Sequence, residues 1–311
     1  DLLSHLQPPS VQDGENHVAL DATTIRSLEI EQTIRGNTCE GSLLWVMQRC
    51  RTAMGKRLLR RWLCEPLANR NAIELRQDVV SVFTDDSSLR ATIQGSLDCV
   101  QDIARIAGRV ATGRVTPRDS VALGRSLLGC TTFSDELQGD ALKSYREELG
   151  KLSKDLHPLA ETITTRCVEA PPAHMRAGGL FVDGFDQALD EARALQRDAG
   201  QWLSAYQAQI VEETNIGTMK VGYNKVFGYY IEVSMAQADR VPDNFTRKQT
   251  LKNAERYITP ELKEHETRVL NASERLEELE SALYRQVCRQ IADAAASLTT
   301  TAQAIATLDV F

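Results

Sequence analysis

A change of hydrophobic period near Gly217 constrains the fold of this chain more than any other feature. Before it, apolar side chains recur at three- and four-residue steps over residues 185–213, which predicts a long helix. After it, apolar and polar residues alternate at period two over residues 218–234 (TMKVGYNKVFGYYIEVS), with a turn region around Gly228. Alternation interrupted by turn residues predicts a β-hairpin.

A second long helix is predicted after the hairpin. Thr259-Pro260 is a start signal, a capping Thr followed by Pro in the first turn. The helix is predicted to run to about residue 306, and four of its apolar residues recur at steps of seven: Leu262, Val269, Leu276 and Leu283. Helices of about 30–45 residues are roughly 45–65 Å long. The predicted fold class is therefore mainly α, a long-helix lever whose antiparallel helix pair carries a small antiparallel β-rich subdomain at its tip.

The N-terminal half is also predicted to be helical. Thr116-Pro117 repeats the start signal of Thr259-Pro260. Periodicity predicts helices over 41–63, 71–84, 87–96, 99–111, 117–128 and 139–168, the last with a break near Pro158. Residues 1–20 and 169–185 are rich in Pro and Gly and are predicted to be loops.

Composition bounds the class of protein. The 311 residues suffice for roughly two domains. Seven scattered cysteines without a CxxC pair indicate reduced thiols in a cytoplasmic protein, and five scattered histidines give no metal-ligand spacing. No apolar run is long enough for a membrane helix, and the N-terminus is not a signal peptide. Because the chain starts at Asp1 rather than Met, we expect it to be a piece of a longer protein.

No catalytic motif is recognisable in the sequence. It has no phosphate-binding loop of the type G-x-x-x-x-G-K-[ST], no G-x-G-x-x-G, no G-x-S-x-G and no H-E-x-x-H. We therefore expect these residues to be neither an enzyme by themselves nor a site for a cofactor or metal.

Positive charge is concentrated in one part of this acidic chain. Residues 218–258 hold seven basic and four acidic residues, a net charge of +3, whereas the whole chain carries −7. Residues 247–257 (RKQTLKNAERY) are the centre of this excess. A basic surface with Asn, Thr and Gln side chains suits the phosphates of a polyanion, and DNA is the leading candidate. We expect such binding to be independent of base sequence. The alternative is a solvated polar strand edge, because lysines commonly protect exposed edges.

A second basic segment weakens any argument from charge alone. Residues 49–61 contain no acid and six cations: Arg49, Arg51, Lys56, Arg57, Arg60 and Arg61. We interpret them as a solvated helix face or as partners of acidic neighbours within the protein. The three tryptophans, Tyr206 and Tyr223 lie on apolar stripes, and we expect core positions for them rather than base-stacking ones.

Several long strings resemble the MutS family of bacterial DNA mismatch-repair proteins. KVGYNKVFGYYIEVS (220–234) and RKQTLKNAERYITPELKEHETRVLNA (247–272) are similar to its clamp region. LDATTIRSLEI (20–30), GSLLWVMQRCRTAMGKRLLRRWLCEPL (41–67) and DIARIAGRVATGRVTPRD (102–119) are similar to its lever, or core, domain. The resemblance covers nearly the whole chain in consistent order.

The resemblance implies a domain plan. Residues 1–20 would end the connector domain, 21–202 would form the first part of the lever, 203–265 the clamp, and 266–311 the return helix toward an ATPase domain. It also implies a homodimer that binds ATP and Mg, and other mismatch-repair proteins as possible partners. The family's mismatch-reading domain, with its Phe-x-Glu wedge, and its ATPase domain have no counterpart in this sequence. We expect those activities to belong to a longer chain that is cytoplasmic and associates with the nucleoid when bound to DNA.

Charge and resemblance together give the expected contacts to duplex DNA phosphates, in order of preference: Lys248, Lys252, Asn253 and Arg256, then Arg247 and Asn224, then Lys225. The alternative function is a helical protein-interaction scaffold whose basic tip is only solvated. The sequence leaves that choice to the structure and to experiment.

Overall fold

The computed structural model describes residues 16–224 and 228–311. The chain divides into two compact units. Unit 1 contains the described residues up to Leu180 together with Tyr284–Phe311, and unit 2 is Phe181–Leu283. Helix α10 contributes residues to both units, because it begins at Pro260 and ends at Asp293.

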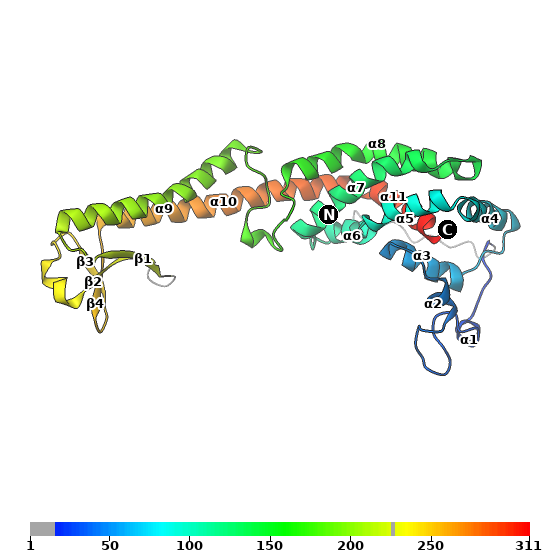
Figure 1. Ribbon diagram of the computed structural model, residues 1–311, viewed down its shortest axis with the longest axis horizontal. Coiled ribbons are helices and arrows are strands. Elements are labelled where there is room, and N and C mark those ends of the chain that lie inside the picture. The colour runs from blue at the N-terminus through cyan, green and yellow to red at the C-terminus, as the bar shows by residue number, and fades with distance from the viewer. Residues whose placement is uncertain (1–15, 225–227) are drawn as a thin grey trace. The chain divides into compact units, whose positions relative to one another are not determined.

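Unit 1 is helical. Its elements are α1 (Ala22–Ser27), α2 (Leu43–Met47), α3 (Ala53–Cys64), α4 (Arg70–Asp85), α5 (Ser87–Asp98), α6 (Ile103–Ala111), α7 (Pro117–Glu136), η2 (Asp140–Leu142), α8 (Lys143–Arg166), η3 (Met175–Ala177), the end of α10, and α11 (Ala295–Val310). Helix α11 packs against α3, α6 and α8, and α7 pairs with α8 (Figure 1). Apolar side chains surround most of α11, so it is the central buried helix of this unit, with Leu298, Ile305 and Leu308 in its core.

A carboxylate near the C-terminus holds the start of α3. Asp309 accepts hydrogen bonds from the backbone N–H groups of Arg51 and Thr52, both at 2.8 Å, and from Thr52 Oγ1 at 2.6 Å. Thr52 in turn caps α3 by accepting from the Gly55 N–H at 2.9 Å. A Cβ at position 55 would overlap the Asp309 carboxylate, so this close approach requires glycine.

These hydrogen bonds to Asp309 explain one error of the sequence prediction. The periodicity of residues 41–63 predicts one helix, but the structure has the short α2, an extended segment, and then α3. The chain leaves the helix at Gln48 because Thr52 starts a new helix on a partner, Asp309, that is 257 residues away. The expected burial of Trp45 is also wrong, since α2 buries only Leu44 and leaves Trp45 half exposed.

Other helix boundaries follow local signals with two exceptions. The capping box of Thr116 and Asp119 starts α7 as the sequence predicts. The break expected near Pro158 is wrong, because α8 continues through it. Pro158 lies on the exposed side of α8, where water can bond the carbonyl that the missing N–H leaves free. The return helix instead ends at Asp293, and α11 begins at Ala295.

Unit 2 is a helix pair that carries a small sheet. Its elements are α9 (Gln187–Thr214), β1 (Lys220–Asn224), β2 (Gly228–Ser234), η4 (Met235–Arg240), β3 (Thr246–Thr250), β4 (Ala254–Ile258) and the first part of α10. The four strands are antiparallel in the order β1-β2-β4-β3. The β-hairpin predicted over residues 218–234 is confirmed by the antiparallel pair β1 and β2.

The two helices of unit 2 are antiparallel, as predicted. Arg193 of α9 pairs with the buried Glu280 of α10 at 2.9 Å, and further along the pair Trp202 stacks on His265 with ring centroids 3.8 Å apart. The sheet lies where α9 ends and α10 begins (Figure 1). One face of it packs on the helices through a core that includes Tyr206, Ile231 and Leu262. The fold class is therefore mainly α with a small antiparallel β subdomain.

Candidate nucleic-acid interface

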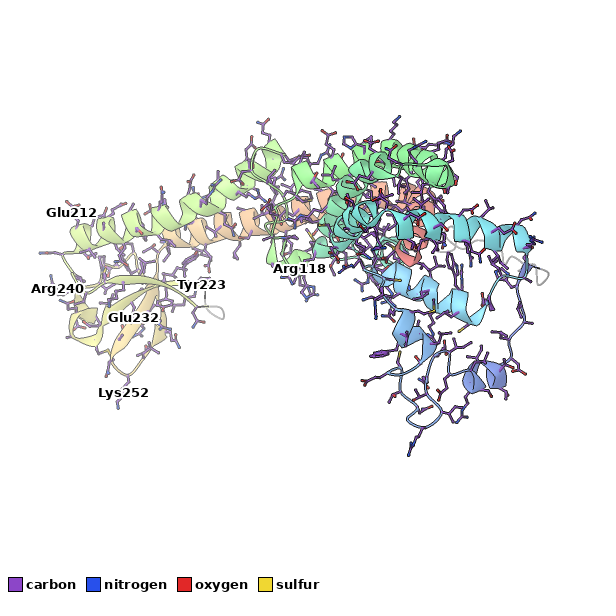
Figure 2. The ribbon with its side chains drawn as sticks, turned by 45° about the vertical axis from the view of Figure 1, so that its right-hand side comes forward. Arg118, Glu212, Tyr223, Glu232, Arg240 and Lys252 are labelled. Atoms are coloured by element: carbon purple, nitrogen blue, oxygen red, sulfur yellow. The ribbon has the colours of Figure 1, made fainter. Side chains whose placement is uncertain are left out.

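The turn between β3 and β4 presents two of the expected contact residues. Lys252 and Asn253 are both exposed, and Figure 2 shows Lys252 pointing away from the sheet at its outer end. The turn is closed by a hydrogen bond of 2.8 Å from the Leu251 N–H to the Ala254 carbonyl. The Asn253 carbonyl accepts from the Met235 N–H at 3.1 Å, which ties the turn to η4. The backbone is thus fixed while both side chains face solvent.

Lys248 occupies an irregularity in β3. Arg247 pairs with Tyr257 and Gln249 with Arg256, so Lys248 is an extra residue without a partner across the ladder. A β-bulge of this kind bends the strand and re-aims a side chain. Lys248 is exposed, and it lies four residues before Lys252 on the same hairpin.

These two lysines differ from the arginines beside them. Neither Lys248 nor Lys252 forms an ion pair within the residues that the structure describes. Arg247 pairs with Glu255 at 3.1 Å while its side chain stays 63% exposed. Lys248 and Lys252 therefore keep their full charge available to an external anion.

Arg256 is engaged within the sheet. Its Nε donates to Glu232 at 2.9 Å, one terminal nitrogen donates to Gln249 at 3.1 Å, and the guanidinium lies 4.0 Å from the centroid of the Tyr230 ring. The side chain is only 18% exposed. These contacts cross β2, β4 and β3, so Arg256 holds three strands together and has little surface left for a phosphate.

The buried carboxylate of Glu255 completes the network. It accepts from the Tyr257 hydroxyl and from Arg247. The hydrogen bond from Tyr257, together with Arg247, holds the pKa of Glu255 below its usual value. Burial and the same hydrogen bond raise the pKa of Tyr257 to about 12. Glu255 is therefore ionised at neutral pH and offsets part of the charge of Arg247.

Another expected contact, Asn224, lies at the opposite edge of the sheet. Asn224 ends β1, whereas the lysines belong to the hairpin of β3, and strands β2 and β4 separate the two edges. Strand spacing of about 4.8 Å puts roughly 14 Å between these edge strands. Lys225 lies outside the described residues. The structure thus brings Lys248, Lys252 and Asn253 together and leaves Asn224 apart from them.

Two residues of β1 were not among the expected contacts. Lys220 is exposed and forms no ion pair with any described residue. The expected core position of Tyr223 is wrong: it is 55% exposed, because the apolar face of the sheet extends past the helices at this edge. Figure 2 shows Tyr223 at the end of β1. The basic composition of residues 218–258 was a signal for Lys220, but the sequence did not show which strand is an edge.

Three of the six cations in the second basic segment pair with acids of unit 1, in line with one of the two interpretations. Arg57 makes two hydrogen bonds to Asp102 at 2.6 and 2.8 Å, Arg60 pairs with Glu31, and Arg51 lies 3.7 Å from Asp98. The pKa of Glu31 is lowered chiefly by its hydrogen bond from Arg60.

The carboxyl of Asp102 shows how strong this pairing is. Burial acts to raise its pKa, but the hydrogen bonds from Arg57 and from the Arg105 N–H outweigh burial, so its pKa lies below the usual value. The acids that pair with Arg51, Arg57 and Arg60 come from two stretches of unit 1, around residue 31 and over residues 98–102.

The described residues hold no group of three or more metal-ligating side chains. No described helix is long and apolar enough to cross a membrane. All seven cysteines are free thiols. Burial raises the pKa of Cys130 to about 12 and that of Cys167 to about 11, so neither is a reactive thiolate.

The fold and the site define a class of protein. It is an acidic, mainly helical protein in which an antiparallel helix pair ends in a small sheet, and the β3–β4 hairpin of that sheet presents lysines without acidic partners among the described residues. The chain belongs to the MutS domain III family, whose model matches residues 23–311.

Individual relatives are DNA mismatch repair proteins named MutS. The chain is 38% identical over 305 residues to the one from Synechocystis sp., which covers 98% of this chain and 35% of that protein. It is 38% identical over 315 residues to that of Salinibacter ruber, covering 99% and 34%. It is 39% identical over 312 residues to that of Methanosarcina acetivorans, covering 99% and 35%. The chain thus spans about a third of the length of these relatives.

Proposed function

We propose that this chain grips the phosphate backbone of duplex DNA in mismatch repair, through the β3–β4 hairpin of unit 2. The observation that supports this most is the pair Lys248 and Lys252, exposed and without ion pairs among the described residues, beside Asn253 on a fixed turn. The relatives' name, DNA mismatch repair protein, supports DNA as the polyanion.

The physical basis of the grip is counterion release. Lysines that replace condensed cations on DNA release them into solution, and that release favours binding at low salt. Asn253 adds a neutral hydrogen bond that fixes position without reading a base. The hairpin is formed by strands β3 and β4 rather than by a helix that would enter a groove, so we expect binding that is independent of base sequence. We propose Lys248, Lys252 and Asn253 as the first phosphate contacts and Arg247 and Asn224 as the next. We propose for Arg256 a structural role, which is to hold the strands of the sheet together.

A salt titration of duplex binding tests the proposal. Each phosphate contact contributes roughly −0.9 to the slope of log K against log salt concentration. Lys248→Ala with Lys252→Ala should therefore reduce the slope by about 1.8 and weaken binding by about tenfold or more at low salt. The matched control is Arg49→Ala with Lys56→Ala, which removes the same charge from two exposed positions of the other basic segment.

The control variant should keep the slope of the unsubstituted chain. Equal losses in both double variants would show that net charge alone governs binding, and the hairpin proposal would fail. An unchanged slope in Lys248→Ala with Lys252→Ala would exclude these two residues as contacts.

We further propose that α10 transmits the DNA-bound state. This one helix contributes Pro260–Leu283 to unit 2 and Tyr284–Asp293 to unit 1, so a change at its start has a continuous path to its end. Hydrogen exchange of residues 284–311 should change when duplex is added, and the change should vanish in the double lysine variant. Duplex binding that leaves exchange in this segment unaltered would contradict transmission. ATP and Mg binding, homodimer formation and nucleoid association stay predictions about a longer chain.

One observation favours a second candidate, a protein-interaction scaffold. Large apolar side chains are exposed close together in sequence around α1 and α2: Leu28, Ile34, Leu43, Trp45, Val46 and Met47. Backbone hydrogen bonds from Leu43 to Glu29 and from Leu44 to Ile30 join the two parts. Exposed apolar clusters mark protein contacts. This surface belongs to unit 1, so it is compatible with DNA binding by unit 2, and Trp45→Ser with Met47→Ser should leave duplex affinity unchanged.

A further inference from the structure

Helix α10 reaches the β1–β2 hairpin through Glu266. The Tyr229 N–H donates to Glu266 Oε1 at 3.1 Å. A Cβ on the preceding residue, Gly228, would overlap the same carboxylate, and Gly228 has a φ of 72°. Glycine is thus required here both by the backbone conformation and by the close approach of Glu266.

Aromatic rings join the same place to both helices. His265, the neighbour of Glu266, stacks on Trp202 of α9 and lies 6.2 Å, centroid to centroid, from the Tyr229 ring. Trp202 also stacks on Tyr206 at 4.7 Å. Tyr229 is therefore held twice by consecutive residues of α10, through its backbone by Glu266 and through its ring by His265.

The position of Tyr229 determines that of Asn224. Gly228 pairs with Asn224 in the ladder, and Tyr229 pairs with Tyr223, whose ring lies 5.0 Å from its own. Among the described strands, β1 pairs with β2 alone, and β4 pairs with β2 only over Ile231–Ser234, so the sheet is two-stranded at Gly228 and Tyr229. A two-stranded hairpin alone is marginally stable in water. The far end of β1 thus depends on contacts from outside the sheet.

We propose that Glu266 is a positioning residue for DNA binding: it fixes the Gly228–Tyr229 backbone and thereby holds Asn224 where it can bond a phosphate. This inference rests on the proposed function, because it assigns Glu266 a role in that same grip. Glu266 acts through Asn224 and does not touch DNA, since its carboxylate would repel a phosphate.

Two readouts separate this role from a general structural one. The first is hydrogen exchange of the Tyr229 amide without DNA. Glu266→Ala removes its acceptor and should speed exchange by about tenfold or more, whereas Glu266→Gln keeps an oxygen at that position and should stay near the unsubstituted rate. Glu264→Ala, an exposed acid on the same helix that pairs with Arg268, is the charge-matched control and should leave the rate unchanged.

The second readout is a double-mutant cycle in duplex affinity. Asn224→Ala should weaken binding by about 10- to 100-fold, the range for one hydrogen bond to a charged group. Glu266→Ala should cause a similar loss relative to Glu264→Ala, and the two changes together should bind no more weakly than Asn224→Ala alone. The loss from Lys252→Ala, on the other hairpin, should add in full to that from Glu266→Ala.

The outcomes distinguish the two proposals. Unchanged Tyr229 exchange in Glu266→Ala, or full additivity with Asn224→Ala, would overturn the positioning role. If Asn224→Ala and Lys252→Ala both leave affinity unchanged while Tyr229 exchange still rises in Glu266→Ala, the proposed DNA grip fails and the hold of Glu266 on the hairpin stands.

Discussion

The two basic segments of this chain look alike in the sequence, and in the structure each has about half of its cations paired with acids. Residues 49–61 carry six cations and no acid, yet Asp98, Asp102 and Glu31 fold back onto three of them. Residues 247–256 carry four cations, of which two arginines are engaged within the sheet and two lysines are left without an ion pair among the described residues. The number of charges in a segment therefore says little about its partner. What decides is which acids the fold places opposite each cation.

The difference also lies in the type of residue. The internally paired cations are arginines, whose planar guanidinium suits two-pronged bonding to a carboxylate, as Arg57 makes with Asp102. The unpaired cations of the hairpin are lysines, which act as mobile point charges that suit a backbone gripped without reading sequence.

The largest expected effect concerns the structural role of residues 49–61. Asp309→Ala removes the acceptor of three donors on Arg51 and Thr52. Leaving the two donors of the buried Thr52 unsatisfied costs about 1–3 kcal/mol each, so we expect unit 1 to lose about 2–4 kcal/mol of unfolding free energy. Urea unfolding followed by Trp45 and Trp62 fluorescence in a Trp202→Phe background measures this unit alone. Asp293→Ala, an exposed acid, should cost less than about 0.5 kcal/mol.

A smaller effect is expected when residues 49–61 lose one acidic partner, Asp102. Asp102→Asn removes the anionic partner of Arg57 and should destabilise unit 1 by about 1–2 kcal/mol, the scale of a charge-assisted hydrogen bond. It should leave the salt dependence of duplex affinity unchanged, because residues 49–61 are not among the proposed contacts. Anisotropy titrations with labelled duplex at several salt concentrations measure this dependence. A steeper slope in Asp102→Asn would mean that Arg57, once freed from Asp102, contacts a phosphate, and would contradict the proposed difference between the segments.

The smallest expected effect is a pH dependence of unit 2. The pKa of Glu255 is lower in the folded chain than its ordinary value. A lowered carboxyl pKa contributes stability that is present above the ordinary carboxyl pKa and is lost as pH falls through the lower pKa of the folded chain. Unit 2 should therefore lose stability on acidification, and Glu255→Gln should make that loss smaller. Trp202 fluorescence in a Trp45→Phe, Trp62→Phe background follows the unfolding of unit 2. A parallel loss in Glu255→Gln would assign the dependence to other carboxyls.

Local signals in the sequence were sufficient for much of the fold. The change of period at Gly217 placed the sheet between two helices, and Thr116 and Thr259 started helices where capping rules put them. The errors arose where a contact with a distant residue, or with solvent, determines where a helix ends. The interruption between α2 and α3 depends on Asp309, and the continuity through Pro158 depends on an exposed helix face.

The candidate site likewise has features that the sequence indicated and features that depend on contacts between distant residues. Composition and resemblance indicated which cations to consider, because the basic excess lies within a short stretch. They could not separate Arg256 from Lys252, since the partner Glu232 is 24 residues from Arg256 in the chain and becomes its neighbour only through strand pairing. Nor could they show that Tyr223 is exposed, because alternation identifies a face of the sheet and not how far the helices cover it.

Photo-crosslinking from one residue in each basic segment would show which segment lies against DNA. A benzophenone amino acid in place of Asn253, or in place of Lys56, would be irradiated with a labelled duplex at the same salt concentration. We expect a covalent DNA adduct from position 253 and none above background from position 56. An adduct from position 56 without one from position 253 would contradict this expectation.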